Sequence, residues 1–251
     1  SKTTKEFILV IHDITQLRYL NSMRRDFISN VSHELRTPVS VIRANSETLL
    51  ESALEDKKQS KVFAKAILHN SERLTEMVTD LLDLSRIEHG ELKLHIEKLN
   101  LQECIDKSID SLKNLGMKKN VVIKCNCPNK PQYVFADKKA LERILTNLID
   151  NAFKYSEENS VINIATKTKH KDDNVLISIT DVGKGISDKD KPIIFDRFYR
   201  TAEARASEKK GSGLGLAIVK NLVNSLNGDV GVKNAPNNRG SQFWITLPIA
   251  K

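Results

Sequence analysis

A long stretch without glycine dominates the first part of the chain. From Ile14 to about Ser52, Pro38 is the only residue expected to interrupt a helix. Apolar residues recur there at spacings of three, four and seven, which is typical of a helix with one buried stripe. The members of this stripe are Ile28, Val31, Leu35, Val39, Ile42 and Leu49. The predicted helix is much longer than the roughly three turns that are usual, and packing of this stripe must supply most of its stability.

A second stripe with the same spacing follows a polar turn that we place at 56–59. Its apolar members are Phe63, Ile67, Leu74, Met77, Leu81 and Leu84, and Asn70 takes the matching position among them. A polar residue at such a position commonly fixes the register of packed helices. Two antiparallel helices bury only one seam, so we expect the hairpin to form a homodimeric four-helix bundle. Gly90 should end the second helix.

His33 lies off the apolar stripe of the first helix. The heptad register places it on the side that faces water, and Arg36 and Thr37 share that surface. Pro38 should kink the helix one turn later. An exposed imidazole beside Glu34, a guanidinium and a hydroxyl suits phosphoryl chemistry, and the alternative is a purely structural histidine.

Strands and helices alternate irregularly after residues 89–91, where we place a domain boundary. Strands are predicted at 92–96, 121–127, 133–136, 161–168, 175–180, 231–233 and 242–247. Helices are predicted at 101–115, 138–155 and 214–226, with 189–198 partly helical; Asn100 and Asp137 act as N-caps and Gly116 as a stop. Hairpin pairs of strands indicate an α+β two-layer sandwich. We therefore divide the chain into 1–13, 14–89 and 90–251. Residues 1–13, with the strand at 6–12, are expected to be the end of a preceding domain or a linker.

Composition narrows the classes of function. The net charge is +8, but Lys and Arg are dispersed among acids without aromatic interleaving, so we expect no nucleic-acid binding. The three cysteines match no metal-ligand pattern. Their odd number, without a secretory segment, favours reduced thiols in the cytosol. No apolar run is long enough to span a bilayer. We expect this chain in the cytosol, with any membrane attachment in a segment before residue 1.

Two features of the second domain point to a nucleotide. Asn147, Asn151 and Lys154 share one helix face, and amide oxygens with an ammonium group suit Mg²⁺ and phosphate; a hydrogen-bonded surface is the alternative. The loop from Asp181 to Gly185 follows a strand directly. Its carboxylate can accept from an exocyclic amino group, which favours adenine over guanine, although most loops of this composition are plain turns.

Two further features suit a polyphosphate. The segment 211–215 (GSGLG) opens a helix whose first amides can receive phosphate oxygens, but it is neither a Walker A loop nor a dinucleotide fingerprint. The charged segment 200–210 follows Phe195 and Phe198, which can anchor one end of a lid. The alternative is an ordinary solvated loop.

Five segments, in order, resemble the H, N, G1, F and G2 boxes of sensor histidine kinases. They are HELRTP at 33–38, NLIDNAFKYS at 147–156, DVGKGI at 181–186, FDRFYR at 195–200 and GSGLGLAIV at 211–219. The resemblance covers the chain from about 18 to 248 and is nearest to the PhoR-like branch, in which a PAS sensor domain precedes the helices. It implies a dimerisation and histidine phosphotransfer hairpin followed by a catalytic ATP-binding domain of the GHKL (Bergerat) fold. No box residue is missing, which disfavours an inactive homologue.

The same resemblance implies roles for individual residues. His33 is similar to the phosphoacceptor, Glu34 to the acid that orients the imidazole and takes its proton, and Thr37 to the residue that positions water in the reverse phosphatase reaction; Arg36 completes this catalytic group. Asn151 matches the Mg²⁺ ligand. The ATP-binding positions are Asn147, Asn151, Lys154, Tyr155, Asp181, Gly183, Gly185, Ile186, Phe195, Arg197, Arg200, Gly211, Ser212, Gly213, Leu214, Gly215 and Leu216.

The expected function is autophosphorylation of His33 from Mg-ATP and transfer of the phosphoryl group to an aspartate of a response-regulator receiver domain, with dephosphorylation of that regulator as a second activity. One rival is a GHKL-type ATPase that drives conformational change, which would hydrolyse ATP without labelling the protein. The other rival is a dimeric helical scaffold in which nucleotide merely regulates docking.

Overall fold

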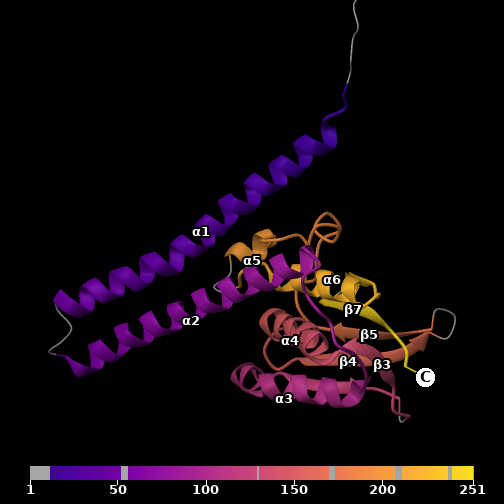
Figure 1. The fold of residues 1–251 in the computed structure, drawn as a ribbon. Helices are drawn as coiled ribbons and strands as arrows, with labels where there is room; N and C mark the ends of the chain where they lie inside the picture. The colour runs from indigo at the N-terminus through magenta and orange to yellow at the C-terminus, as the bar shows by residue number, and fades with distance from the viewer. Residues whose placement is uncertain are drawn as a thin grey trace, which may run out of the picture. The chain divides into compact units, whose positions relative to one another are not determined.

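The structure, a computed structural model, describes residues 12–51, 56–128, 130–169, 173–206, 211–236 and 239–250. The chain separates into two compact units, residues 1–74 and 75–251. The first unit contains helix α1 (Thr15–Glu51) and the beginning of α2 (Lys57–Glu88), whose remainder belongs to the second unit (Figure 1). The strand predicted at 6–12 lies almost wholly outside the described residues. No described helix combines the length and the apolar character needed to cross a membrane.

Aspartates fix the beginning of both long helices. Asp13 Oδ1 accepts a hydrogen bond of 2.9 Å from the backbone N–H of Thr15, and Asp56 Oδ1 accepts one of 2.8 Å from that of Lys58. Each bond satisfies a first-turn amide that has no partner within the helix. Because α2 begins at Lys57, the polar turn predicted at 56–59 is wrong beyond its first residue.

The apolar stripes are only partly covered within one chain. Ile28 and Val39 of α1 are 54% and 51% exposed. On α2, Met77 and Leu84 are buried, and so is Asn70, whose side-chain amide donates to the carbonyl of Ala66 at 2.8 Å. The buried amide is therefore satisfied by its own helix.

A five-stranded sheet forms one layer of the second unit (Figure 1). Its strand order is β2-β4-β5-β7-β6. Strands β2 and β4 pair in parallel, and the other pairs are antiparallel. Strands β1 and β3 form a separate antiparallel pair. The strands are β1 (Ile96–Asn100), β2 (Val122–Asn126), β3 (Tyr133–Asp137), β4 (Val161–Lys169), β5 (Asn174–Thr180), β6 (Val230–Asn234) and β7 (Ser241–Pro248).

Three helices form the second layer: α3 (Leu101–Lys119), α4 (Lys138–Tyr155) and α6 (Gly215–Ser225). Helix α4 contacts both α3 and α6. Its residues Ile144 and Leu148, four apart, are buried, as are Ile162 and Ile164 at alternate positions of β4. This pattern of one buried face per element confirms the α+β two-layer sandwich that the sequence predicts.

Asp137 caps α4 as predicted, since its Oδ1 accepts from the amide of Ala140 at 2.9 Å. Asn100 likewise caps α3, whose end was predicted wrongly. The helix continues past Gly116 and ends at Lys119. Asn120 follows it in the left-handed conformation (φ 53°), which ends the helix there.

Other predicted boundaries also differ from the structure. The strand predicted at 92–96 is β1, which begins only at Ile96. Residues 189–198 form turns and no helix, whereas a short helix, α5 (Ala202–Ala206), lies in the segment predicted as a loop. One turn of helix is too short to show an apolar period, so the sequence contained no signal for α5.

Candidate active site

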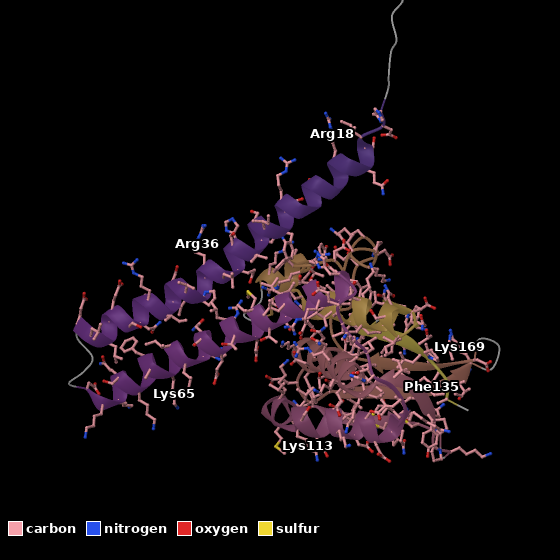
Figure 2. All side chains as sticks on the ribbon, in the orientation of Figure 1. Arg18, Arg36, Lys65, Lys113, Phe135 and Lys169 are labelled. Atoms are coloured by element: carbon pink, nitrogen blue, oxygen red, sulfur yellow. The ribbon has the colours of Figure 1, made fainter. Side chains whose placement is uncertain are left out.

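His33, Arg36 and Thr37 are all exposed on α1. Figure 2 shows Arg36 projecting away from the helix. Thr37 Oγ1 donates to the carbonyl oxygen of His33 at 3.4 Å, a weak bond of a helical hydroxyl. Glu34 instead approaches α2, where its Oε2 lies 3.5 Å from Nη2 of Arg73. The imidazole therefore faces water, as the register predicts, while the carboxylate of Glu34 pairs with Arg73 of the second helix.

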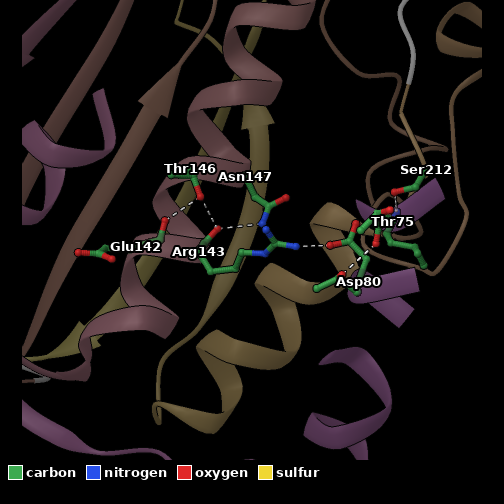
Figure 3. Close-up of polar contacts among 9 residues, drawn as sticks. Thr75, Asp80, Glu142, Arg143, Thr146, Asn147 and Ser212 are labelled. Carbon is green, nitrogen blue, oxygen red and sulfur yellow. Dashed lines mark hydrogen bonds and ion pairs between the residues drawn. The ribbon is translucent and has the colours of Figure 1, made fainter. Parts of the chain in front are cut away.

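The middle of α4 presents two half-buried asparagines on one face. Asn147 Nδ2 donates to the carbonyl oxygen of Arg143 at 2.8 Å, as Figure 3 shows. Within the described chain, the side chain of Asn151 has no hydrogen-bond partner. One turn later, Lys154 Nζ lies 2.5 Å from Oδ2 of Asp150. The amide of Asn151 is thus available to a ligand.

An amide oxygen in this setting fits Mg²⁺. This cation prefers oxygen ligands and is usually held by one or two protein groups together with substrate phosphates and water. The described residues contain no group of three or more His, Cys, Asp or Glu that could hold a metal on its own. The donor set therefore suits a magnesium ion that arrives with a polyphosphate.

Asp181 is buried at the end of β5, with 4% of its surface exposed. Its Oδ1 accepts from the amide of Ser241 at 3.1 Å, and its own amide donates to the Ser241 carbonyl at 2.9 Å. The surrounding backbone is so close that side chains are excluded. A Cβ on Gly183 would lie 2.5 Å from the carbonyl oxygen of Tyr155, and one on Gly240 would lie 2.0 Å from that of Asp181.

The beginning of α6 lies against Asn147. A Cβ on Gly215 would come within 2.5 Å of Asn147 Oδ1. The N-cap residue Leu214 offers no side-chain hydrogen bond, and its amide donates to Ser212 Oγ at 3.3 Å. The first-turn amides of α6 are therefore available for an anion, beside the helix face that carries Asn151.

The segment before the predicted lid is anchored in the domain. Phe195 is 8% exposed and packs edge-to-face on Phe243, with ring centroids 6.2 Å apart. The amide of Phe198 donates to the Gly213 carbonyl at 2.9 Å. Tyr199 donates its hydroxyl hydrogen to Asp190, which raises the pKa of the tyrosine. The F-box and G2-box segments are thus joined directly.

Three arginines near the site are engaged with protein groups. Arg197 pairs with Glu88 of α2, and Arg200 donates to the carbonyl of Ala204. Arg143 pairs with Asp80 of α2 (Figure 3). Burial raises the pKa of Asp80 and of Glu88, outweighing the attraction of each arginine.

The other predicted site residues line the same loops. Gly185 and Gly213 have positive φ angles of 76° and 72°. Ile186 and Leu216 are half-buried, Tyr155 is 38% exposed, and nothing lies within 4 Å of a Cβ on Gly211. Sequence reasoning missed Ser241, because it meets Asp181 from 60 residues away; its only local signal was Gly240 before a strand.

Two family models match the chain. Residues 23–90 match the His Kinase A (phospho-acceptor) domain, and residues 136–251 match the histidine kinase-, DNA gyrase B- and HSP90-like ATPase. This chain belongs to the sensor histidine kinases. The matched regions contain His33 and all of the predicted ATP-binding positions, respectively.

Named sensor histidine kinases are similar over nearly the whole chain. WalK of Bacillus subtilis is 34% identical over 241 residues, which are 96% of this chain and 39% of WalK. SenX3 of Mycobacterium bovis is 33% identical over 249 residues, which are 99% of this chain and 60% of SenX3. The chain therefore spans less than two thirds of the length of either relative.

Solved histidine kinases share the fold. AdeS of Acinetobacter baumannii superimposes with a TM-score of 0.71 and 26% identity over 87% of this chain and 98% of AdeS. ThkA, solved in complex with the response regulator protein TrrA, gives a TM-score of 0.70 at 22% identity over 94% of this chain and 65% of ThkA. These similarities confirm the predicted helical hairpin followed by a GHKL-type domain.

Proposed function

We propose that this chain is the kinase core of a two-component system, which transfers the γ-phosphoryl group of ATP to His33 and then to an aspartate of a response-regulator receiver domain. The observation that supports this proposal most directly is that α4 contacts both predicted nucleotide loops. The carbonyl of Tyr155 lies against Gly183, and the side chain of Asn147 lies against Gly215. A nucleotide site of this kind is useful to a phospho-acceptor domain only if the two act on each other.

The proposed chemistry uses few protein groups. The neutral imidazole of His33 attacks the γ-phosphorus of ATP, and the bond from that phosphorus to the leaving ADP oxygen breaks. Glu34 would turn from Arg73 to orient the ring and accept its proton. In the reverse reaction on the regulator, Thr37 would position the attacking water, with Arg36 beside it.

The nucleotide would be held along α4. Asp181 would accept from the exocyclic amino group of adenine, and the first amides of α6, with Lys154, would receive phosphate oxygens. Asn151 would hold Mg²⁺, which when bound offsets charge on the phosphates. Arg197 and Arg200 would have to leave Glu88 and Ala204 before contacting phosphate.

We further propose a homodimer. Apolar side chains of the hairpin are exposed in a single chain, as expected if a second copy covers them in a four-helix bundle. They include Ile28, Val39, Leu50, Val62 and Leu68, which are 51–73% exposed.

We also propose a division into domains at 14–89 and 90–251, which follow a PAS-like sensor domain. We propose a cytosolic location for this chain, because ATP and response regulators are found there.

The test is to incubate the purified chain with ATP labelled at the γ-phosphate. We expect a labelled protein whose bond survives base and is lost in acid, and whose label moves to an added cognate receiver domain. An acid-stable, base-labile bond would contradict the proposal. Steady ATP hydrolysis with no labelled protein would favour the GHKL ATPase instead.

A further inference from the structure

Lys119, the last residue of α3, reaches the end of α4. Its Nζ donates to the carbonyl oxygens of Phe153 and Lys154 at 2.8 Å and to that of Ser156 at 3.4 Å. The last carbonyls of a helix have no partner within it and form the negative end of its dipole. Charge-assisted bonds to them are stronger than neutral ones. Lys119 therefore caps α4 from a neighbouring helix.

Further contacts fasten the end of α3 to the turn after α4. Asn120 Nδ2 donates to Asn159 Oδ1 at 2.7 Å, and the amide of Asn159 donates to the carbonyl of Lys119 at 3.1 Å. The two helices approach closely here, since a Cβ on Gly116 would lie 2.8 Å from the ring of Phe153. The position of Lys119 is thus fixed by several contacts.

The opposite side of the same turn touches the Asp181 loop. The Tyr155 carbonyl lies where a Cβ on Gly183 would meet it at 2.5 Å, and the amide of Glu157 donates to the Val182 carbonyl at 2.9 Å. The turn and the loop are therefore in direct contact through backbone groups. A shift of the α4 end is therefore passed directly to the residues that follow Asp181.

We infer that Lys119 is a positioning residue for nucleotide binding, which fixes the end of α4 and, through it, the loop at 181–183. This inference rests on the proposed function, because it requires adenine to bind at Asp181. Lys119 acts at the adenine end and so has the same effect on every adenine nucleotide, whatever its number of phosphates.

Lys119→Met tests this by removing the ammonium group and keeping an apolar stem. Calorimetry should show the Kd of ATP and of ADP both raised by roughly five- to tenfold. The KM for ATP in autophosphorylation should rise by a similar factor, while kcat at saturating ATP changes by less than about twofold. Lys119→Arg should recover most of the affinity, since a guanidinium can also donate to several carbonyls.

The matched control is Lys113→Met on the same helix. Figure 2 shows Lys113 on the outer surface of α3, where it pairs with Asp110 at 2.5 Å, so its removal should leave both Kd values unchanged. If Lys119→Met lowers only the binding-competent fraction and leaves Kd at the wild-type value, the role is merely structural and the inference is overturned. Absence of ATP binding by the wild-type chain would instead refute the proposed function, on which the inference depends.

Discussion

The hairpin and the ATP-binding unit present their functional groups by different means. His33 is exposed through the register of one helix, without support from distant residues. Asp181 is buried and held by Ser241 from another strand, under glycines that permit backbone contact. A group on an open helix face needs only that helix, whereas a pocket needs the whole domain. Substitution of the acceptor should therefore remove chemistry alone, and substitution of the closely packed groups that shape the pocket should also affect folding.

The sharpest test of this difference is His33→Gln. We expect labelling by ATP to fall by more than about 100-fold, because the nucleophile is lost, while the Kd of ATP and the free energy of unfolding stay at wild-type values. His69→Gln, at an exposed position of α2, should label normally. Labelled protein from His33→Gln would mean that another residue is the acceptor.

Asn151→Asp should lower the rate of autophosphorylation by about 10- to 100-fold, since a carboxylate adds negative charge beside the triphosphate. Stability should hardly change, because the Asn151 side chain has no partner in the described chain. Asn147→Asp should behave differently and lose about 1 kcal/mol of stability, because the carboxylate cannot donate to Arg143. Initial rates against Mg²⁺ concentration, with thermal unfolding, check both. If Asn151→Asp and Asn147→Asp lost the same free energy of unfolding, the predicted difference between the two asparagines would be wrong.

Gly183→Ala should cost about 1–3 kcal/mol of unfolding free energy and weaken ATP binding, because the added methyl meets the Tyr155 carbonyl at 2.5 Å. Gly211→Ala is the matched control for stability alone, since nothing lies within 4 Å of a Cβ at that position. Urea unfolding and calorimetry measure the two effects. If Gly183→Ala and Gly211→Ala had the same free energy of unfolding, close approach of the backbone would not be what shapes the pocket.

The smallest effect concerns Asp80, on the part of α2 that belongs to the second unit. Burial raises its pKa, so the folded state holds the proton more tightly than the unfolded state. The resulting stabilisation is present below the ordinary pKa and is lost as pH rises through the folded pKa. Asp80→Asn removes this loss, so its stability relative to wild type should increase from about pH 4 to pH 7, by less than about 1 kcal/mol.

Thermal unfolding across this range measures the difference between Asp80→Asn and wild type. Glu72→Gln, at an exposed position of the same helix, should follow the wild-type profile. A relative stability that fell with rising pH would show that the attraction of Arg143 outweighs burial at this site. The ion pair, and not burial, would then determine how Asp80 affects stability as the pH changes.

The sequence was sufficient to predict elements whose signals are local. Helices α1 and α4 show long apolar periods and aspartate caps, and the box residues stand at recognisable spacings. Gly116 was misjudged because its role is tertiary: it admits the ring of Phe153 and does not stop the helix. The support of Asp181 by Ser241 and of α4 by Lys119 could not be predicted, since no local pattern connects residues that meet only after folding.

Strand β2 lies at the edge of the sheet, and the chain that joins it to its parallel partner β4 runs through α4. Parallel neighbours cannot be joined by a tight turn, so this helix is the crossover that makes the pairing possible. We therefore expect the edge strand and the helix that carries Asn147 and Asn151 to open together in hydrogen exchange. Free energy gained from a ligand bound to α4 would then also stabilise the edge strand β2, which that ligand does not touch.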